Sequence, residues 1–139
     1  MTVRLSDDAR QYIARFEEAT DATARDCLVY DERLVFLVKA GEMATAIGPG
    51  GQTVEALEED LGVRVELVED ADTVEAFVAN ALAPAAVYNV TISENDDTVA
   101  YVEVDHGDRG VAIGSDGRNI ETARRLAERH YGVDDVQLT

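Results

Sequence analysis

The sequence predicts an α+β protein made of two copies of one small domain. A glycine-rich turn of the form Ile-Gly-x-x-Gly occurs twice, at residues 47–51 (IGPGG) and 113–117 (IGSDG). Around each turn, the hydrophobic periodicity indicates the same order of helix, strand, strand, helix, helix and strand. The second series begins where the first ends, near residues 69–72. We therefore expect one domain over residues 1–70 and a second over residues 71–139.

In the first copy, Ser6 is a suitable N-cap for a helix, and Asp7 and Asp8 fit its first turn. Gly62 is a suitable C-terminal stop for the helix that follows the glycine turn. The predicted elements are a helix over 7–22, strands over 27–30 and 34–39, a short helix ending at 47, a helix over 52–61 and a strand over 63–68.

In the second copy, an amphipathic helix carries Phe77 and ends before Pro84, which cannot continue a helix. Gly132 ends the helix that follows the second glycine turn. The predicted elements are a helix over 73–82, strands over 86–93 and 98–105, a short helix from 108, a helix over 118–131 and a strand over 133–138.

The register of the two copies supports an internal duplication. Identical or similar residues between 35 and 55 recur between 101 and 121 at a constant offset of 66, and the offset becomes 70 at Gly62 and Gly132. Four added residues make about one helical turn. The helix after the turn is therefore predicted to be longer in the second copy, with its apolar face unrotated.

The composition is that of a folded but very acidic chain. Hydrophobic residues make up 46% of the 139 residues, and 12 basic against 29 acidic residues give a net charge of −17. Such a charge argues against nucleic-acid binding if it is taken alone. It also fits a cytoplasm rich in salt, because the Debye length falls to roughly 3 Å at about 1 M. The acids are spread along the chain and Lys39 is the only lysine, so we favour the halophilic interpretation.

The cellular compartment is predicted from three further features. The first 16 residues lack the basic start and apolar run of a signal peptide, and no apolar stretch approaches the length of a membrane span. Cys27 is the single cysteine, which rules out an intramolecular disulfide and suits a core position in a reducing cytosol. We expect a cytoplasmic protein without a membrane partner.

Each glycine turn is chemically suited to a phosphate backbone. Glycine lets a polyphosphate approach the chain closely, and the helix that follows presents N–H groups without internal partners. An apolar floor beside each turn would support splayed bases, whose edges the neighbouring strand would read. The residues expected on that floor are Ile47, Val54 and Leu57 in the first copy and Ile113, Ile120 and Ala123 in the second.

Other interpretations of the turns are weaker. A glycine connector between helices, without a ligand, remains an alternative, although the repetition of the flanking residues makes it less attractive. A P-loop is excluded because neither turn is followed by Lys-Ser or Lys-Thr. A dinucleotide fingerprint requires a turn directly after a strand, whereas each turn here is expected between helices.

The segments AIGPGGQTVEAL and AIGSDGRNIETARRL resemble the KH-domain signature. The predicted element order resembles the type II KH arrangement, with a three-stranded sheet packed against helices. Two such domains in about 140 residues, together with LVKAGEMATAIG, DRGVAIG and ERHYGVDDVQL, resemble the archaeal NusA-like transcription factors. This resemblance implies binding of single-stranded RNA and a role in transcription termination or antitermination beside RNA polymerase. We expect no cofactor, metal or small-molecule substrate.

The two turns depart from the KH pattern in different ways. The middle positions, which often carry a basic residue, hold Pro49-Gly50 and Ser115-Asp116. Arginines surround the second turn, so we expect the second copy to contribute more to RNA affinity. The candidate RNA contacts are Lys39, Ile47, Gly48, Pro49, Gly50, Gly51 and Val54 in the first copy, and Arg109, Ile113, Gly114, Ser115, Asp116, Gly117, Arg118, Ile120 and Arg125 in the second.

Some of these assignments have a simpler alternative. Arg124, Arg125 and Arg129 would also serve in ordinary surface ion pairs, for example with Glu121. The acidic runs 58–60 and 96–97 are most simply solvated faces or turns. No nucleophile–base pair or metal-ligand cluster is visible, so a non-enzymatic role is predicted. The alternative to an RNA-binding factor is an acidic interaction module that docks on RNA polymerase or the ribosome.

Overall fold

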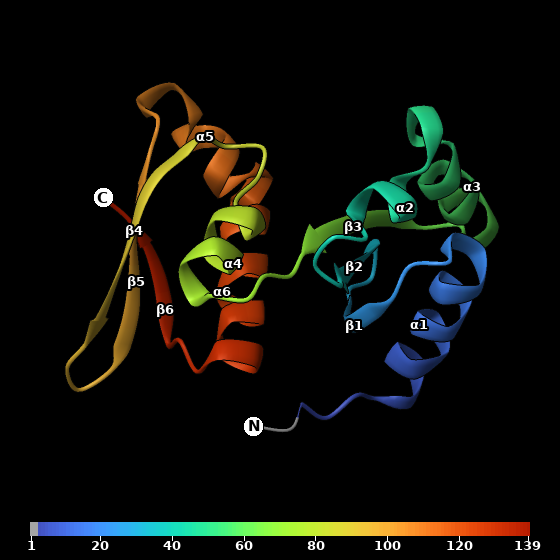
Figure 1. Cartoon of the computed structure of the whole chain (residues 1–139), viewed down its shortest axis with the longest axis horizontal. Coiled ribbons are helices and arrows are strands. Elements are labelled where there is room, and N and C mark those ends of the chain that lie inside the picture. Colours follow the sequence, from blue (N-terminus) through green and yellow to red (C-terminus); the bar gives the residue numbers. More distant parts are fainter. Residues whose placement is uncertain (1–2) are drawn as a thin grey trace. The chain divides into compact units, whose positions relative to one another are not determined.

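A computed structural model describes residues 3–139, and these residues form two compact units. Arg4–Asp70 make up one unit, and Ala71–Thr139 make up the greater part of the other. The two are described separately below (Figure 1).

The first unit follows the predicted order of elements. Its strands form one sheet in the order β1-β2-β3, with β1 antiparallel and β3 parallel to the central strand β2. Its elements are α1 (Asp7–Thr20), β1 (Ala24–Val29), β2 (Arg33–Val38), α2 (Met43–Ile47), the 3₁₀ turn η1 (Pro49–Gly51), α3 (Gln52–Leu61) and β3 (Arg64–Glu69).

The core of the first unit lies between its helices and one face of this sheet. Phe16 of α1 and Phe36 of β2 are fully buried, and their rings stack with centroids 4.5 Å apart. Ala46 of α2 and Leu57 of α3 belong to the same buried cluster. The helices that carry the glycine turn are therefore fixed to the sheet by apolar packing.

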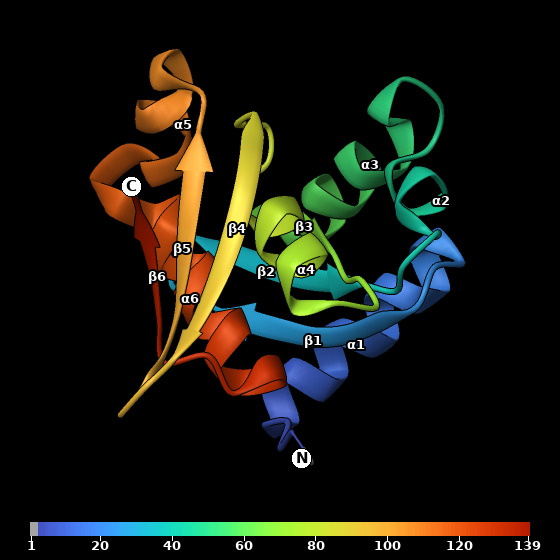
Figure 2. The ribbon, with the colours of Figure 1, turned by 60° about the vertical axis from the view of Figure 1, so that its left-hand side comes forward.

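The second unit repeats the first. The strands lie side by side in the order β4-β5-β6, again with one antiparallel and one parallel pairing (Figure 2). Its elements are α4 (Val74–Ala81), β4 (Val87–Glu94), β5 (Thr98–Val104), the 3₁₀ turn η2 (His106–Asp108), α5 (Arg109–Ile113), the 3₁₀ turn η3 (Ser115–Gly117), α6 (Arg118–Tyr131) and β6 (Asp135–Leu138).

The duplication extends to the irregularities of the sheets. The antiparallel pairing shifts register between Ala24 and Asp26 in the first unit, and between Val87 and Asn89 in the second. The helix after the turn has 10 residues in α3 and 14 in α6, which confirms the predicted difference in length. The repeat is therefore structural as well as sequential.

Most predicted boundaries agree with the structure to within two residues, and the first strand is the main exception. It was predicted to begin at Cys27 but begins at Ala24, because a bulge and the polar pair Arg25-Asp26 interrupt the apolar pattern. The predicted core position of Cys27 is confirmed, with 4% of its surface exposed. Burial raises the pKa of this thiol to about 12, so it stays protonated at neutral pH.

Candidate nucleic-acid interface

The two glycine turns have almost the same backbone. Each joins two helices, α2 to α3 in the first unit and α5 to α6 in the second, as the sequence predicted. The first glycine has φ 77° and ψ 170° at Gly48, and φ 79° and ψ 171° at Gly114. The last glycine has φ 79° at Gly51 and 75° at Gly117. Two different local sequences therefore adopt one turn.

The first glycine of each turn is required by space as well as by its dihedral angle. A Cβ on Gly114 would lie 2.8 Å from both Cβ and the backbone nitrogen of Asn119. A Cβ on Gly48 would overlap the hydroxyl of Thr53. Asn119 also fixes the second turn, because its Nδ2 donates to the carbonyl of Val111 at 3.3 Å.

The fourth position of the Ile-Gly-x-x-Gly turn is left-handed in both units, with φ 61° at Gly50 and 56° at Asp116. Aspartate is among the few residues that adopt this region as single residues. The Asp116 side chain is exposed at the turn, next to exposed Ser115. The second turn therefore adds a negative charge where the first has only glycine.

A hollow of about 490 Å³ opens beside the second turn. This volume lies within the range of roughly 300–1,000 Å³ that is common for ligand pockets. Apolar side chains are accompanied by two guanidinium groups, and the lining residues are Arg109, Ile113, Gly117, Ile120, Arg124, Gln137 and Leu138. The hollow thus joins the glycine turn to the last strand, β6.

The free edge of β6 faces this hollow. The N–H of Val136 donates to Oδ1 of Asp135 at 2.8 Å, and its carbonyl accepts from Nε of Arg124 at 3.1 Å. Further along the strand, the N–H of Thr139 donates to the carbonyl of Val102 in β5 at 2.9 Å, so Thr139 points toward β5. Leu138 is the residue just before it. Because main-chain groups alternate in direction along a strand, the N–H and carbonyl of Leu138 point away from β5.

Two arginines of the hollow are held at opposite ends of β6, one by the residue after the strand and one by its first residue. Nη1 of Arg109 donates to the carbonyl of Thr139 at 2.8 Å. Arg124 lies 2.9 Å from Asp135 and 3.8 Å from Glu121. The hydrogen bond from Gln137, the Val136 N–H and the nearby Arg124 together hold the pKa of Asp135 below its usual value. The surface-pair interpretation is therefore confirmed for Arg124, which nevertheless also lines the hollow.

The other arginines of α6 differ in their distance from the turn. Arg118 is exposed at the first residue of the helix, and Arg125 is exposed about two turns further along the same face. Arg129 lies in the last turn, roughly 16 Å along the axis from Arg118. Arg118 is thus best placed for a ligand at the glycine turn, and Arg129 is remote from it.

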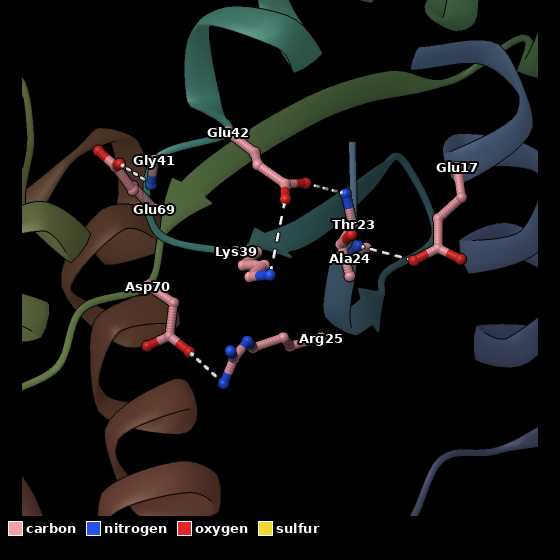
Figure 3. Close-up of polar contacts among 9 residues, drawn as sticks. All are labelled: Glu17, Thr23, Ala24, Arg25, Lys39, Gly41, Glu42, Glu69 and Asp70. Atoms are coloured by element: carbon pink, nitrogen blue, oxygen red, sulfur yellow. Dashed lines mark hydrogen bonds and ion pairs between the residues drawn. The ribbon is translucent and has the colours of Figure 1, made fainter. Parts of the chain in front are cut away.

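Carboxylates surround the chain that leads into the first turn (Figure 3). Oε1 of Glu42 accepts the N–H of Thr23 at 2.6 Å, while its Oε2 lies 3.9 Å from Nζ of Lys39. Glu69 accepts the N–H of Gly41 at 3.0 Å. Lys39, a candidate RNA contact, is therefore already in an ion pair, although half of its side chain is exposed.

Two expectations about the floor of the turns are wrong. Leu57 and Ala123 are 2% and 1% exposed, because they belong to the buried cores of their units. Leu57 borders a different hollow, whose other lining residues include Ala19 of α1. Ile120 is only 7% exposed but lines the hollow beside the second turn. By contrast, Ile47 and Ile113 are 37% and 39% exposed, as a floor requires.

The structure also bears on membrane and metal sites. None of the helices within residues 3–139 has the length and apolar character of a membrane span. Over the same residues, no three His, Cys, Asp or Glu side chains are grouped to hold a metal ion.

The comparisons with known proteins agree with this architecture. Residues 9–75 match the KH domain family, and residues 74–137 match the NusA-like second KH domain. The fold and the two turns thus define a tandem KH-domain protein.

Similar chains identify the family. The "Probable transcription termination protein NusA" of Halobacterium salinarum is 68% identical over 139 residues, covering 100% of both chains. That of Halococcus morrhuae is 65% identical and covers 99% of each. The crystal structure of APE1850 is 32% identical, with a TM-score of 0.84 over 97% of this chain and 100% of that one. The chain belongs to the NusA-like transcription termination protein family of archaea, and these two relatives come from halophilic archaea.

Proposed function

We propose that the chain binds nascent single-stranded RNA through the grooves of both KH domains, over residues 1–70 and 71–139, with the second groove providing most of the affinity. The binding would serve transcription termination or antitermination in contact with RNA polymerase, in the cytoplasm. The observation that supports this best is the hollow between the second turn and the free edge of β6. The relatives' names, which refer to transcription termination, agree with it.

In the second groove, each part of a nucleotide has a suitable partner. The phosphate backbone would lie against Gly114, Ser115 and Gly117, where the turn admits it closely and the N-terminus of the 14-residue helix α6 favours an anion. Arg118 stands at that helix start, with Arg109 and Arg125 as further cations. A KH turn clamps about four nucleotides in this manner.

The bases would lie over the apolar floor of Ile113, Ile120 and Leu138. Stacking and apolar contact with a base contribute about 1–3 kcal/mol each and depend little on sequence. The outward N–H and carbonyl of Leu138 offer one donor and one acceptor to the edge of a base. Sequence preference would therefore come from this strand edge.

The first groove offers the same backbone with weaker chemistry. Its candidate contacts are the turn residues Gly48, Pro49, Gly50 and Gly51, the apolar pair Ile47 and Val54, and Lys39. Pro49 has no N–H to donate, and Lys39 is paired with Glu42. A weak second site still raises overall affinity, because tethering increases its effective concentration.

The net charge of −17 makes salt the decisive condition for the test. At low salt the acidic surface repels RNA over a long range, whereas at about 2 M KCl only contacts within a few ångströms count. We expect the full chain to bind a labelled RNA of randomised sequence, about 12 nucleotides long, at this high salt. Absence of binding there would contradict the proposal.

The second candidate is an acidic module that docks on RNA polymerase or the ribosome and barely binds RNA. The net charge and the carboxylates around the first turn favour it. Retention of the chain on immobilised RNA polymerase at about 2 M KCl, without RNA binding, would select this candidate. RNA binding by the free chain would select the first.

A further inference from the structure

One pair of equivalent residues contacts the last strand in both units with opposite charge. Glu58 lies seven positions after Gly51, and Arg124 lies seven positions after Gly117. Oε2 of Glu58 accepts the N–H of Val65 at 2.8 Å, and Nε of Arg124 donates to the carbonyl of Val136 at 3.1 Å. Both contacts reach the outermost strand of their sheet, at the residue after its first.

The register of the sheets shows that Val65 and Val136 are equivalent. Val65 lies opposite Leu34 on the central strand β2, and Val136 lies opposite Ala100 on β5. Leu34 and Ala100 are related by the same offset of 66 as the glycine turns. Position 58 in one unit therefore occupies the place of position 124 in the other.

Arg124 is prepared for an anion in the hollow. Its side chain is 38% exposed, and Asp135 and the Val136 carbonyl hold it from one side. A guanidinium has five N–H groups in a planar fork. Within residues 3–139 its contacts use Nε and Nη1, which leaves the N–H groups of Nη2 for a ligand. The group is held in place before binding, so little entropy is lost when a phosphate arrives.

The first groove replaces this donor with an acceptor. The Glu58 carboxylate accepts hydrogen bonds only, and it repels a phosphate oxygen. The other positions change in the same direction: Met43 stands in place of Arg109, Gln52 in place of Arg118 and Glu59 in place of Arg125. Position 58 differs from these because its carboxylate is held in place by a hydrogen bond from the main chain of β3.

We propose that this position determines how strongly each groove takes the RNA backbone: Arg124 contacts a phosphate in the second groove, and Glu58 keeps the first groove weak. The inference rests on the proposed RNA binding. It adds one structural position at which the residue strengthens binding in the second domain and weakens it in the first.

The loss side of the test compares Arg124→Gln with Arg129→Gln in the full chain. Both remove one positive charge from α6, but Arg129 lies in the helix's last turn. We expect Arg124→Gln to weaken binding of the randomised RNA about tenfold, since a charged hydrogen bond is lost. Its plot of log affinity against log salt should flatten by about 0.7, the value for one single-strand phosphate contact. Arg124→Lys should keep that slope, because the charge remains.

The second part of the test replaces the negative charge of Glu58 with a positive one and looks for a gain in RNA affinity. Glu58→Arg, placed in the Arg124→Gln chain, should recover affinity at least threefold and restore the slope, whereas Glu18→Arg on exposed α1 should do neither. Glu58→Gln keeps a carbonyl acceptor for the Val65 N–H, so it separates loss of charge from loss of this bond. Glu58→Arg in the otherwise unaltered chain should also raise RNA affinity and steepen the salt dependence, so this arm decides the matter even if the Arg124 variants fold poorly.

The outcomes separate the inference from the function on which it rests. If the unaltered chain fails to bind RNA, the proposed function is wrong and the inference falls with it. If the unaltered chain binds, but Arg124→Gln behaves like Arg129→Gln and Glu58→Arg behaves like Glu18→Arg, the inference alone is wrong. If all variants give the same salt slope, Arg124 does not contact a phosphate and serves only to connect α6 with β6.

Discussion

The two KH domains share a backbone and differ in the charge placed on it. The dihedral angles of the two glycine turns agree within a few degrees, and the same bulge occurs in both sheets. Yet the second turn is bordered by Arg109, Arg118 and Arg124, whereas the first has Met43, Gln52 and Glu58 at these places. The comparison shows that this turn is set by glycine and packing, and we expect its affinity for anions to be set by the neighbouring charges.

The acidic residues of the two domains also serve their folds. In each domain a carboxylate at the start of the helical segment accepts an N–H from the chain before the first strand, Glu42 from Thr23 and Asp108 from Ala86. The prediction that residues 58–60 form a solvated face is accordingly incomplete, because Glu58 accepts a main-chain bond and Asp60 lies 2.7 Å from Arg15.

The largest expected effect comes from removing the first glycine of the second turn. Gly114→Ala places a methyl group 2.8 Å from Asn119 and forces alanine to φ +79°, which costs about 1–3 kcal/mol. We expect lower stability in urea unfolding and loss of most RNA binding. Gly48→Ala should destabilise the first domain comparably while reducing RNA binding less.

Gly110→Ala is the control for this pair, since a Cβ there has open space. It should leave unfolding unchanged or slightly raise stability. Equal loss of RNA binding from Gly48→Ala and Gly114→Ala would remove the expected difference between the grooves.

The next effect tests phosphate contact at the turns without straining them. Ser115→Asp and Pro49→Asp add a carboxylate at equivalent exposed positions. We expect Ser115→Asp to weaken RNA binding about fivefold and Pro49→Asp less than threefold, since repulsion near the surface contributes on the order of 1 kcal/mol. Ser115→Ala and Pro49→Ala are the controls in the same titration. A larger loss from Pro49→Asp would reverse the assignment of the leading groove.

A smaller effect is expected from the two carboxylates that accept the N–H before the first strand. Glu42→Ala and Asp108→Ala each leave one N–H without its partner, so each should lower the free energy of unfolding by about 1 kcal/mol. Denaturation in urea at high salt measures both. Unchanged stability in both variants would show that these bonds contribute little beyond what water supplies.

Removing the cation at the start of α6 should weaken RNA binding slightly and leave the stability of the fold unchanged. Arg118→Ala is expected to weaken RNA binding about threefold to fivefold, because one exposed phosphate contact is lost. Gln52→Ala, the equivalent change in the first domain, should have no measurable effect. The same RNA titration compares them, and equal responses would contradict the charge difference between the grooves.

The smallest effect concerns acid. The hydrogen bonds from Gln137 and the Val136 N–H, with Arg124 nearby, hold the pKa of Asp135 below its usual value, so these contacts are fully present above the ordinary pKa of an aspartate and are lost as pH falls through the lowered pKa. The amide resonance of Val136 should report this protonation between pH about 5 and about 2 by NMR. A midpoint at or above the ordinary aspartate pKa of about 3.9 would show that the contacts at the β6 edge are weaker than the geometry indicates.

The order of elements was predictable because its signals are local. Ser6, Gly62, Pro84 and Gly132 act on the helices that they cap or end, and strand alternation needs only a few residues. The glycine turns were located for the same reason. The bulge at Ala24 was missed, because its position depends on pairing with β2.

The chemistry of the grooves was less predictable because it depends on pairing between distant segments. Arg124 was treated as a surface residue, and only the register of β6 places it beside the hollow. Lys39 was predicted to contact RNA, but in the structure its Nζ lies 3.9 Å from the carboxylate of Glu42. Ala123 has the right periodicity for a floor but lies on the side of α6 that enters the core. The repeat offset already paired Glu58 with Arg124, and that charge reversal was a signal in the sequence.

Asp116 carries a consequence for how long RNA stays bound. It takes a left-handed backbone at φ 56°, where glycine stands in the first turn, and it brings a negative charge to the proposed phosphate path. Differences in affinity between related complexes arise mostly from dissociation rates. Under the proposed function, a transcript that lengthens continuously would have to be released and rebound, and a carboxylate beside the phosphate path would shorten each encounter. Asp116→Gly should therefore slow dissociation while leaving association nearly unchanged.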